Sequence, residues 1–136
     1  MNKLAKGVAV TVIALALPLA AAPSAFAAVN DNSCDVAESC VFLNSYYGGG
    51  MDDMSSTDSD WRNNYFSSGG SVHDAVSSGF GHNRAEEYWV DVNFSGAHFT
   101  LGVNQYDSLW TTNQPNASSS SYNFNDKCDS NALVIG

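Results

Sequence analysis

Apolar and polar residues alternate along two stretches in the second half of the chain. In 88–94 every second residue is Tyr, Val, Val or Phe, and in 99–103 every second residue is Phe, Leu or Val. A period of two residues predicts strands with one buried face. A short strand is expected over 132–135, and runs rich in Gly, Ser or Asn at 48–50, 67–70 and 113–121 predict turns. Helical periodicity extends to one turn at most, around 74–78, so the chain is expected to be all-β.

A pattern of two aromatic residues and a glycine occurs twice with the same spacing. Its copies are Phe42, Tyr47 and Gly49, and then Trp89, Phe94 and Gly96. Such a pattern is typical of a hairpin in which a turn folds the strand over, so that the second aromatic ring packs back on the first. The glycine allows the bend, because a residue without Cβ tolerates positive φ. We therefore expect these four aromatic residues to fill the core.

Each copy is followed by a loop rich in polar and acidic residues. The first loop is expected at 81–87, with Asn83 and Glu86, and the second at 124–130, with Asn125, Asp126, Asp129 and Ser130. The hairpin patterns are 47 residues apart and Asn83 is 43 residues from Asp126. The sequence therefore predicts an internal duplication, with a four-residue insertion or deletion between the halves.

Two such signatures, each followed by an Asn/Asp loop and a strand, resemble the βγ-crystallin family. The stretch from Cys34 to Cys40, directly before Phe42, is most similar to the secreted actinobacterial branch known as peptidase inhibitor family I36. The resemblance implies two Greek key motifs, at about 40–87 and 88–136, forming one small β-sandwich. It also implies inhibition of an extracellular peptidase by a loop held on a rigid scaffold, although the sequence does not mark the reactive site.

Residues 1–27 are expected to be a secretory signal peptide. Lys3 and Lys6 precede an apolar run over 8–22, and Ala25 and Ala27 form a small-residue cleavage pattern. Cleavage would leave 28–136 as a single domain, secreted and extracellular, which we expect to be a monomer.

The predicted mature chain is strongly acidic. It keeps three basic residues (Arg62, Arg84 and Lys127) against 14 acidic ones, a formal charge of −11. Such a charge disfavours binding to nucleic acid and to anionic membranes, and it favours cations or a basic partner. The simpler interpretation is that the charge keeps a secreted protein soluble.

The three cysteines permit more than one disulfide in an exported protein. Cys128 could be a buried free thiol, replace one partner of the bridge, or pair between chains. The family pattern implies a Cys34–Cys40 bridge.

The resemblance also implies calcium ligands in the two polar loops. The family's loop begins with two Asn or Asp residues and ends with Ser or Thr and then Ser, which supply oxygen atoms to Ca²⁺. The second loop keeps Asn125, Asp126 and Ser130 but has Asp129 at the fifth position, and the first keeps only Asn83, with Glu86 at the fifth. Alternatively, these side chains only cap turns through their own backbone. The stretch 52–56 also fits the letters of the motif, but it directly follows the glycine bend.

Other chemistry is not indicated. The spacing of His73, His82 and His98 matches no zinc signature, so a zinc site is not expected. The chain contains none of the G-x-S-x-G, H-E-x-x-H or cysteine-protease motifs, and we expect no enzyme. Trp61, Tyr65 and Trp110 lie in connecting segments and could cover the core or contact a sugar or protein.

Three functions therefore remain open. The first is peptidase inhibition, the second is an extracellular calcium-binding module without inhibitory activity, and the third is a cell-wall-binding or toxin-like protein on the same fold. They differ in what they require, namely a reactive loop, an oxygen-rich ion site, or exposed aromatic residues.

Overall fold

The computed structural model describes residues 31–111, 114 and 116–134, and this part of the chain contains seven β-strands. The strands are β1 (Glu38–Asn44), β2 (Gly48–Met54), β3 (Ser78–His82), β4 (Glu86–Asp91), β5 (Ser95–Leu101), β6 (Tyr106–Asp107) and β7 (Ser130–Leu133). Two 3-10 turns, η1 (Ser45–Tyr47) and η2 (Trp61–Asn63), are its helical elements. The expected all-β class is confirmed, whereas the residues around 74–78 form a turn and the start of β3 instead of a helical turn.

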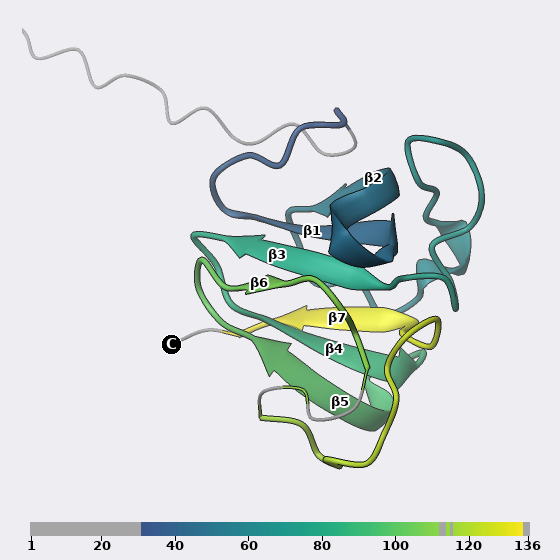
Figure 1. The fold of residues 1–136 in the computed structure, drawn as a ribbon, viewed down its shortest axis with the longest axis vertical. Helices are drawn as coiled ribbons and strands as arrows, with labels where there is room; N and C mark the ends of the chain where they lie inside the picture. The colour runs from purple at the N-terminus through teal and green to yellow at the C-terminus, as the bar shows by residue number, and fades with distance from the viewer. Residues whose placement is uncertain (1–30, 112–113, 115, 135–136) are drawn as a thin grey trace, which may run out of the picture.

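The strands form two antiparallel sheets that exchange segments between the halves of the chain. The first sheet has the order β2-β1-β3-β6 and the second has the order β5-β4-β7 (Figure 1). Thus β6, from the second half, extends the sheet of the first half. Reciprocally, Asp58 of the first half forms a bridge with Asn131 of β7, in the second sheet. This exchange makes the two halves interlocking Greek keys, the motif that the βγ-crystallin resemblance implied.

Both hairpins contain the irregular turn that their signature predicts. The register of β1 with β2 shifts between Phe42 and Asn44, and that of β4 with β5 shifts between Trp89 and Asp91. At the turn, Gly49 and Gly96 have φ of 78° and 79°. In the first hairpin, the rings of Phe42 and Tyr47 meet edge to face at 5.5 Å, so the second ring packs back on the first as expected.

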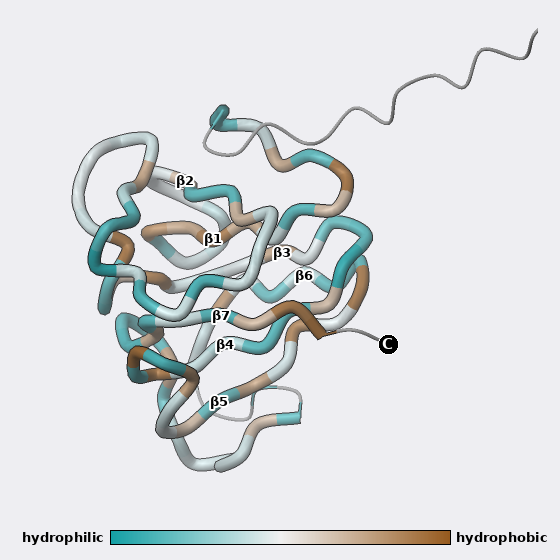
Figure 2. Tube along the Cα trace, turned by 180° about the vertical axis from the view of Figure 1, so that it is seen from behind, coloured by the Kyte–Doolittle hydropathy of each residue, from teal (hydrophilic) through white to brown (hydrophobic). Residues whose placement is uncertain are grey.

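The core lies between the sheets and uses the residues that alternate with the signature aromatics. Figure 2 shows hydrophobic and hydrophilic positions alternating along β5. Val41, Tyr88 and Phe99 are fully buried. Phe42, Trp89 and Phe94 are only half-buried and Tyr47 is 36% exposed, so the expectation that these four fill the core was wrong. For Phe42 and Trp89 the reason is the period of two, because a strand that directs Val41 or Tyr88 inward directs its neighbour to the outer face. Tyr47 and Phe94 lie beyond the register shifts, in η1 and in the turn between β4 and β5, where the strand alternation no longer holds.

Two tryptophans from the connecting segments complete the core. Trp61 and Trp110 are both 0% exposed. The Trp61 indole donates a hydrogen bond of 2.8 Å to the Asn131 side chain, and the Trp110 ring lies 4.6 Å from that of Tyr88. A surface contact through either tryptophan is therefore excluded, whereas Tyr65 is 64% exposed.

The cysteines are arranged as the family resemblance implied. Cys34 and Cys40 form a disulfide, with their Cα atoms 5.9 Å apart, directly at the start of β1. Cys128 is free and buried, which resolves the three alternatives in favour of an internal thiol. Desolvation by burial raises the pKa of the Cys128 thiol well above its ordinary value, so the thiol is not expected to be reactive.

The predicted signal peptide, residues 1–27, lies outside the described residues. Within the described ranges, none of the helical segments is both long and apolar enough to span a membrane.

Candidate functional site

One serine in each half, Ser78 and Ser130, occupies the equivalent position, and this equivalence identifies the polar loop that ends at each serine. Ser78 pairs with Phe42 in the first sheet, and Ser130 pairs with Trp89 in the second. Each hydroxyl donates to a carbonyl oxygen of the folded hairpin, Asn44 O at 2.7 Å and Asp91 O at 2.8 Å. Each also accepts a backbone N–H from the second signature aromatic, at 3.1 and 3.2 Å. The six-residue loop that ends at Ser130 therefore has its counterpart in the loop that ends at Ser78.

The first polar loop is accordingly His73–Ser78. Its second residue, Asp74, and the second residue of the other loop, Asp126, both have φ of 53°. The sequence pattern placed Asn83 and Glu86 in this loop, because the stretch 81–87 follows the first hairpin signature at nearly the spacing of 124–130 after the second, and that placement was wrong. The signal that could have found the loop is the pair Ser77-Ser78, which matches the end of the motif.

The residues that the sequence assigned to the first loop lie elsewhere. Asn83 is in the turn after β3, at the opposite end of that strand from Ser78, and its backbone N–H donates to the Asn104 side chain. Glu86 begins β4, is 0% exposed, and forms an ion pair with Arg84 at 2.7 Å. Arg84 also donates to the Ala37 and Met54 carbonyls. These contacts give Glu86 a structural role in the core rather than a place beside Asp126.

The two true loops contact each other reciprocally. The backbone N–H of Asp74 donates to Asp129 Oδ1 at 3.0 Å, and the Ser77 hydroxyl donates to Asp126 Oδ1 at 3.1 Å. The Asp126 N–H also donates to the Val76 carbonyl at 2.9 Å. In both cases the second residue of one loop meets the fifth residue of the other. The repeat thus generates two polar clusters, each built from both halves of the chain.

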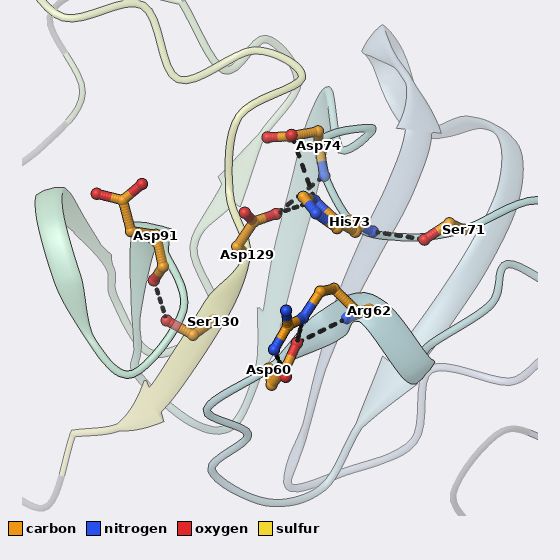
Figure 3. A network of polar contacts seen from close by, with 8 residues as sticks. All are labelled: Asp60, Arg62, Ser71, His73, Asp74, Asp91, Asp129 and Ser130. Carbon is orange, nitrogen blue, oxygen red and sulfur yellow. Dashed lines mark hydrogen bonds and ion pairs between the residues drawn. The ribbon is translucent and has the colours of Figure 1, made fainter.

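The first cluster consists of His73, Asp74 and Asp129 (Figure 3). His73 Nδ1 lies 2.6 Å from Asp129 Oδ1 and 3.3 Å from Asp74 Oδ2. The three ligand atoms are all within 4.8 Å of one another, a spacing at which one ion could contact them. Asp129 is only 7% exposed, and burial raises the pKa of its carboxyl, with a further contribution from the charge of Asp74.

The ring nitrogen of His73 is close to both carboxylates. Nδ1 is buried, and Asp129 Oδ1 lies within hydrogen-bonding distance of it. The backbone of His73 is held separately, because its N–H donates to the Ser71 hydroxyl at 3.2 Å. The imidazole therefore directs one buried nitrogen toward two carboxylates.

The second cluster contains Ser77, Asp126 and Asn125. Asp126 Oδ1 accepts from Ser77, and its Oδ2 accepts from the Asn125 side chain at 2.7 Å. The donors that this cluster offers to a cation are oxygen atoms. Asp126 is exposed and Asn125 is half-buried. Hard cations such as Ca²⁺ prefer such oxygen ligands.

The positive charge of the neighbouring Arg62 is already paired with a carboxylate. Arg62 lies close enough to Asp129 to interact with its charge, but it forms an ion pair and hydrogen bonds with Asp60 (Figure 3). The hydrogen bonds from Arg62 lower the pKa of the Asp60 carboxyl to about 2. Arg62 therefore opposes a cation at Asp129 less than an unpaired guanidinium would.

The stretch 52–56 lines a different feature, a small pocket of about 130 Å³. Asp52, Asp58 and Asn64 are among its lining residues. Asp52 is 3% exposed and accepts one hydrogen bond, of 3.3 Å, from the Asn64 side chain. Its pKa is raised to about 7, chiefly by burial.

Comparisons with known proteins place the fold. No family model matches the chain, and no curated protein matches it. Solved structures do match. One, described as "Evolution of the eye lens beta-gamma-crystallin domain fold", is 21% identical with a TM-score of 0.60, covering 80% of this chain and 95% of that one.

Two further βγ-crystallins give the same result. That from Ciona intestinalis is 21% identical, with a TM-score of 0.52 over 71% of this chain and 99% of that one. That from an archaeon is 19% identical, with a TM-score of 0.54 over 74% and 100%. At these identities the likeness is one of architecture, and it shows that this chain has the βγ-crystallin fold.

Proposed function

We propose that this protein is an extracellular βγ-crystallin-type module that binds divalent cations, calcium in particular, at its paired loops. The observation that carries the proposal is the reciprocal contact of the loops, which brings Asp74 to Asp129 and Asp126 to Ser77. Carboxylate and hydroxyl oxygens converge there from segments far apart in the sequence. A role as an enzyme is not supported by any motif in the chain.

The donor set fits calcium best at the second cluster. Ca²⁺ takes six to eight oxygen ligands and accepts irregular geometry, with water completing its shell. Asp126, Ser77 and Asn125 all present side-chain oxygens, and the exposure of Asp126 leaves room for water. The formal charge of −11 expected for residues 28–136 adds a general attraction for cations.

Ion binding would stabilise the folded protein and would not catalyse a reaction. Each cluster contains residues from both Greek keys, so a bound ion would hold the halves together. An ion that binds only the folded state stabilises it by mass action, by about 2.7 kcal/mol at a concentration 100 times its dissociation constant. Such a gain suits a small module exposed to extracellular conditions.

The first prediction tests this stabilisation. Residues 28–136, melted in EDTA and then in millimolar Ca²⁺, should show a melting temperature several degrees higher with calcium. Asp126→Ala should remove most of the gain, because it deletes the carboxylate shared with Ser77. Asp35→Ala is the matched control, since Asp35 is an exposed carboxylate in the disulfide loop. An equal melting temperature with and without calcium would contradict the proposal.

Peptidase inhibition rests on the resemblance to family I36. Its support in the structure is limited to the Cys34–Cys40 bridge at the start of β1. The resemblance to this family implies a second disulfide, in the later half, that carries the inhibitory loop. In the described part of this chain the later half has instead Cys128, which is a buried free thiol. Stoichiometric slowing of a secreted serine peptidase or metallopeptidase, with the protein surviving long incubation, would make inhibition the leading function.

A further inference from the structure

We propose that the His73–Asp74–Asp129 cluster binds a nitrogen-preferring transition ion of the zinc class, and that the two loops therefore take different metals. The inference rests on the proposed function, because it assigns the ion of one of the two clusters. The spacing of the histidines along the chain matches no zinc signature, so the site exists only through the fold.

The first argument is the identity of the donors. The opening position of the first loop is His73, where the second loop has Asn125. Imidazole nitrogen suits zinc, copper, nickel and iron, whereas Ca²⁺ and Mg²⁺ select oxygen. One nitrogen and two carboxylates are donors that zinc accepts, with a fourth position left for water. The second cluster, with oxygen donors, provides an internal contrast.

The second argument is geometric. Zinc bonds of ~2.0 to 2.2 Å place the atoms of a tetrahedral ligand set about 3.3 to 3.6 Å apart. His73 Nδ1 and Asp74 Oδ2 are 3.3 Å apart. His73 Nδ1 and Asp129 Oδ1 are closer, at 2.6 Å, and would separate slightly around an ion. With every ligand atom within 4.8 Å of the others, rotation of side chains is sufficient.

The third argument is the position of the His73 nitrogen. Nδ1 is buried and faces both carboxylates, at 2.6 Å from Asp129 Oδ1 and 3.3 Å from Asp74 Oδ2. A metal ion would use the lone pair of this nitrogen and would also neutralise carboxylates held close together. Access is available, because the side chains of His73 and Asp74 are 34% and 58% exposed.

The competing explanation is a protonated imidazole that bridges the two carboxylates without any ion. The two explanations differ in what His73→Asn does to metal binding. The substitution removes the nitrogen donor and gives the first loop the same opening residue as the second. His82→Asn is the matched control, since His82 belongs to β3 and its ring contacts the Cys34 carbonyl.

The experiment is titration calorimetry of the full mature chain, stripped with EDTA, against Zn²⁺ alone, Ca²⁺ alone, and Zn²⁺ in millimolar Ca²⁺. We expect one tight zinc site per chain that survives excess calcium. His73→Asn should weaken zinc binding at least tenfold, because loss of even an outer-shell partner costs about 10- to 100-fold in affinity. His82→Asn should leave zinc binding unchanged.

Cobalt substitution gives a spectroscopic readout. Co²⁺ in a site with nitrogen and oxygen ligands should give visible absorption bands that His73→Asn abolishes and His82→Asn retains. A melt in EDTA checks that each variant is folded. Should His73→Asn be unfolded, His73→Gln provides the second variant.

The outcomes separate the two proposals. Calcium binding that depends on Asp126, together with no zinc site or a zinc site indifferent to His73→Asn, would overturn this inference and leave the proposed function standing. A zinc site that requires His73, without calcium binding, would overturn the calcium assignment and support the inference. If neither Ca²⁺ nor Zn²⁺ binds, both the calcium proposal and the zinc inference are overturned.

Discussion

At the scale of single residues, the acidic composition conceals carboxyls in very different environments. Asp52 lies in β2 with 3% exposure and one hydrogen bond from Asn64, so burial raises its pKa to about 7. Asp60 accepts hydrogen bonds from Arg62, which lower its pKa to about 2. The same residue type therefore affects stability in opposite directions.

The second prediction concerns the pH dependence that Asp52 causes. Its pKa in the folded state, about 7, exceeds the ordinary value of 3.8, so the folded state binds the proton more tightly. The stabilising contribution is then complete below pH ~4 and is lost as the pH rises toward and through ~7. Asp52→Asn should remove this loss and be more stable than the wild type at pH ~8, by an amount on the order of 1 kcal/mol or more.

Urea denaturation at several pH values between about 5 and 8 measures the difference. Asp60→Asn is the control, because a carboxyl with a pKa of about 2 is ionised in both states throughout that range. Its stability curve should therefore run parallel to that of the wild type. An Asp52→Asn curve parallel to the wild type as well would show that Asp52 titrates normally.

At the scale of elements, the folded hairpins are the most predictable part of the molecule. The two hairpins could be recognised in the sequence, 47 residues apart, because a tight bend with positive φ favours glycine at one position. The first polar loop was misplaced because its identity depends on contacts with the other half. The pair Ser77-Ser78 matches the end of the motif, but the equivalence of Ser78 and Ser130 is established by the hydrogen bonds through which each holds a hairpin.

The third prediction tests the second hairpin bend through Gly96. A Cβ atom there would lie 2.5 Å from Asp91 Oδ2 and 2.7 Å from Val90 Cγ2, in a backbone with φ of 79°. Gly96→Ala should therefore be destabilised by both crowding and strain, by about 2 to 4 kcal/mol.

Gly69→Ala separates the two effects. Gly69 has φ of 87°, but a Cβ added there would meet no atom within 4 Å, so only backbone strain, about 1 kcal/mol, is expected. Chemical denaturation of both variants gives the comparison. Equal losses would mean that the contacts around Gly96 relax freely.

At the scale of the whole molecule, the halves are joined through their tryptophans as well as through their strands. Trp61, from the first half, donates to Asn131 of the second. Trp110, from the second half, lies against Gly79 of β3, where an added Cβ would approach its ring to 2.6 Å. The glycine thus makes the space that the large ring requires.

The fourth prediction follows from that burial. Trp110→Ala should destabilise the protein by about 3 to 5 kcal/mol, because it leaves a large cavity beside Tyr88 and Phe99. Tyr106→Ala, at a 63% exposed aromatic residue, should cost much less. Thermal and urea denaturation measure both. A Trp110→Ala variant as stable as Tyr106→Ala would contradict the buried placement.

This burial also bears on the cell-wall-binding alternative. Any loss of polysaccharide binding in Trp110→Ala or Trp61→Ala would reflect unfolding, since both rings are 0% exposed. That alternative is tested by substituting exposed aromatic residues, such as Tyr46, Tyr65 and Tyr106, and measuring polysaccharide binding.

The sequence by itself determined the properties that depend on neighbouring residues. Alternation predicted the all-β class and the inward direction of Tyr88, Val90, Phe99 and Leu101, and the repeated signature predicted the two bends. Alternation failed beyond the strand ends, where Phe94 is half-buried and Val103 is 56% exposed. Only the tertiary structure decided which loops meet, because His73 and Asp74 reach Asp129 although more than 50 residues separate them along the chain. Local spacing cannot encode such a contact, which the packing of two interlocked Greek keys creates.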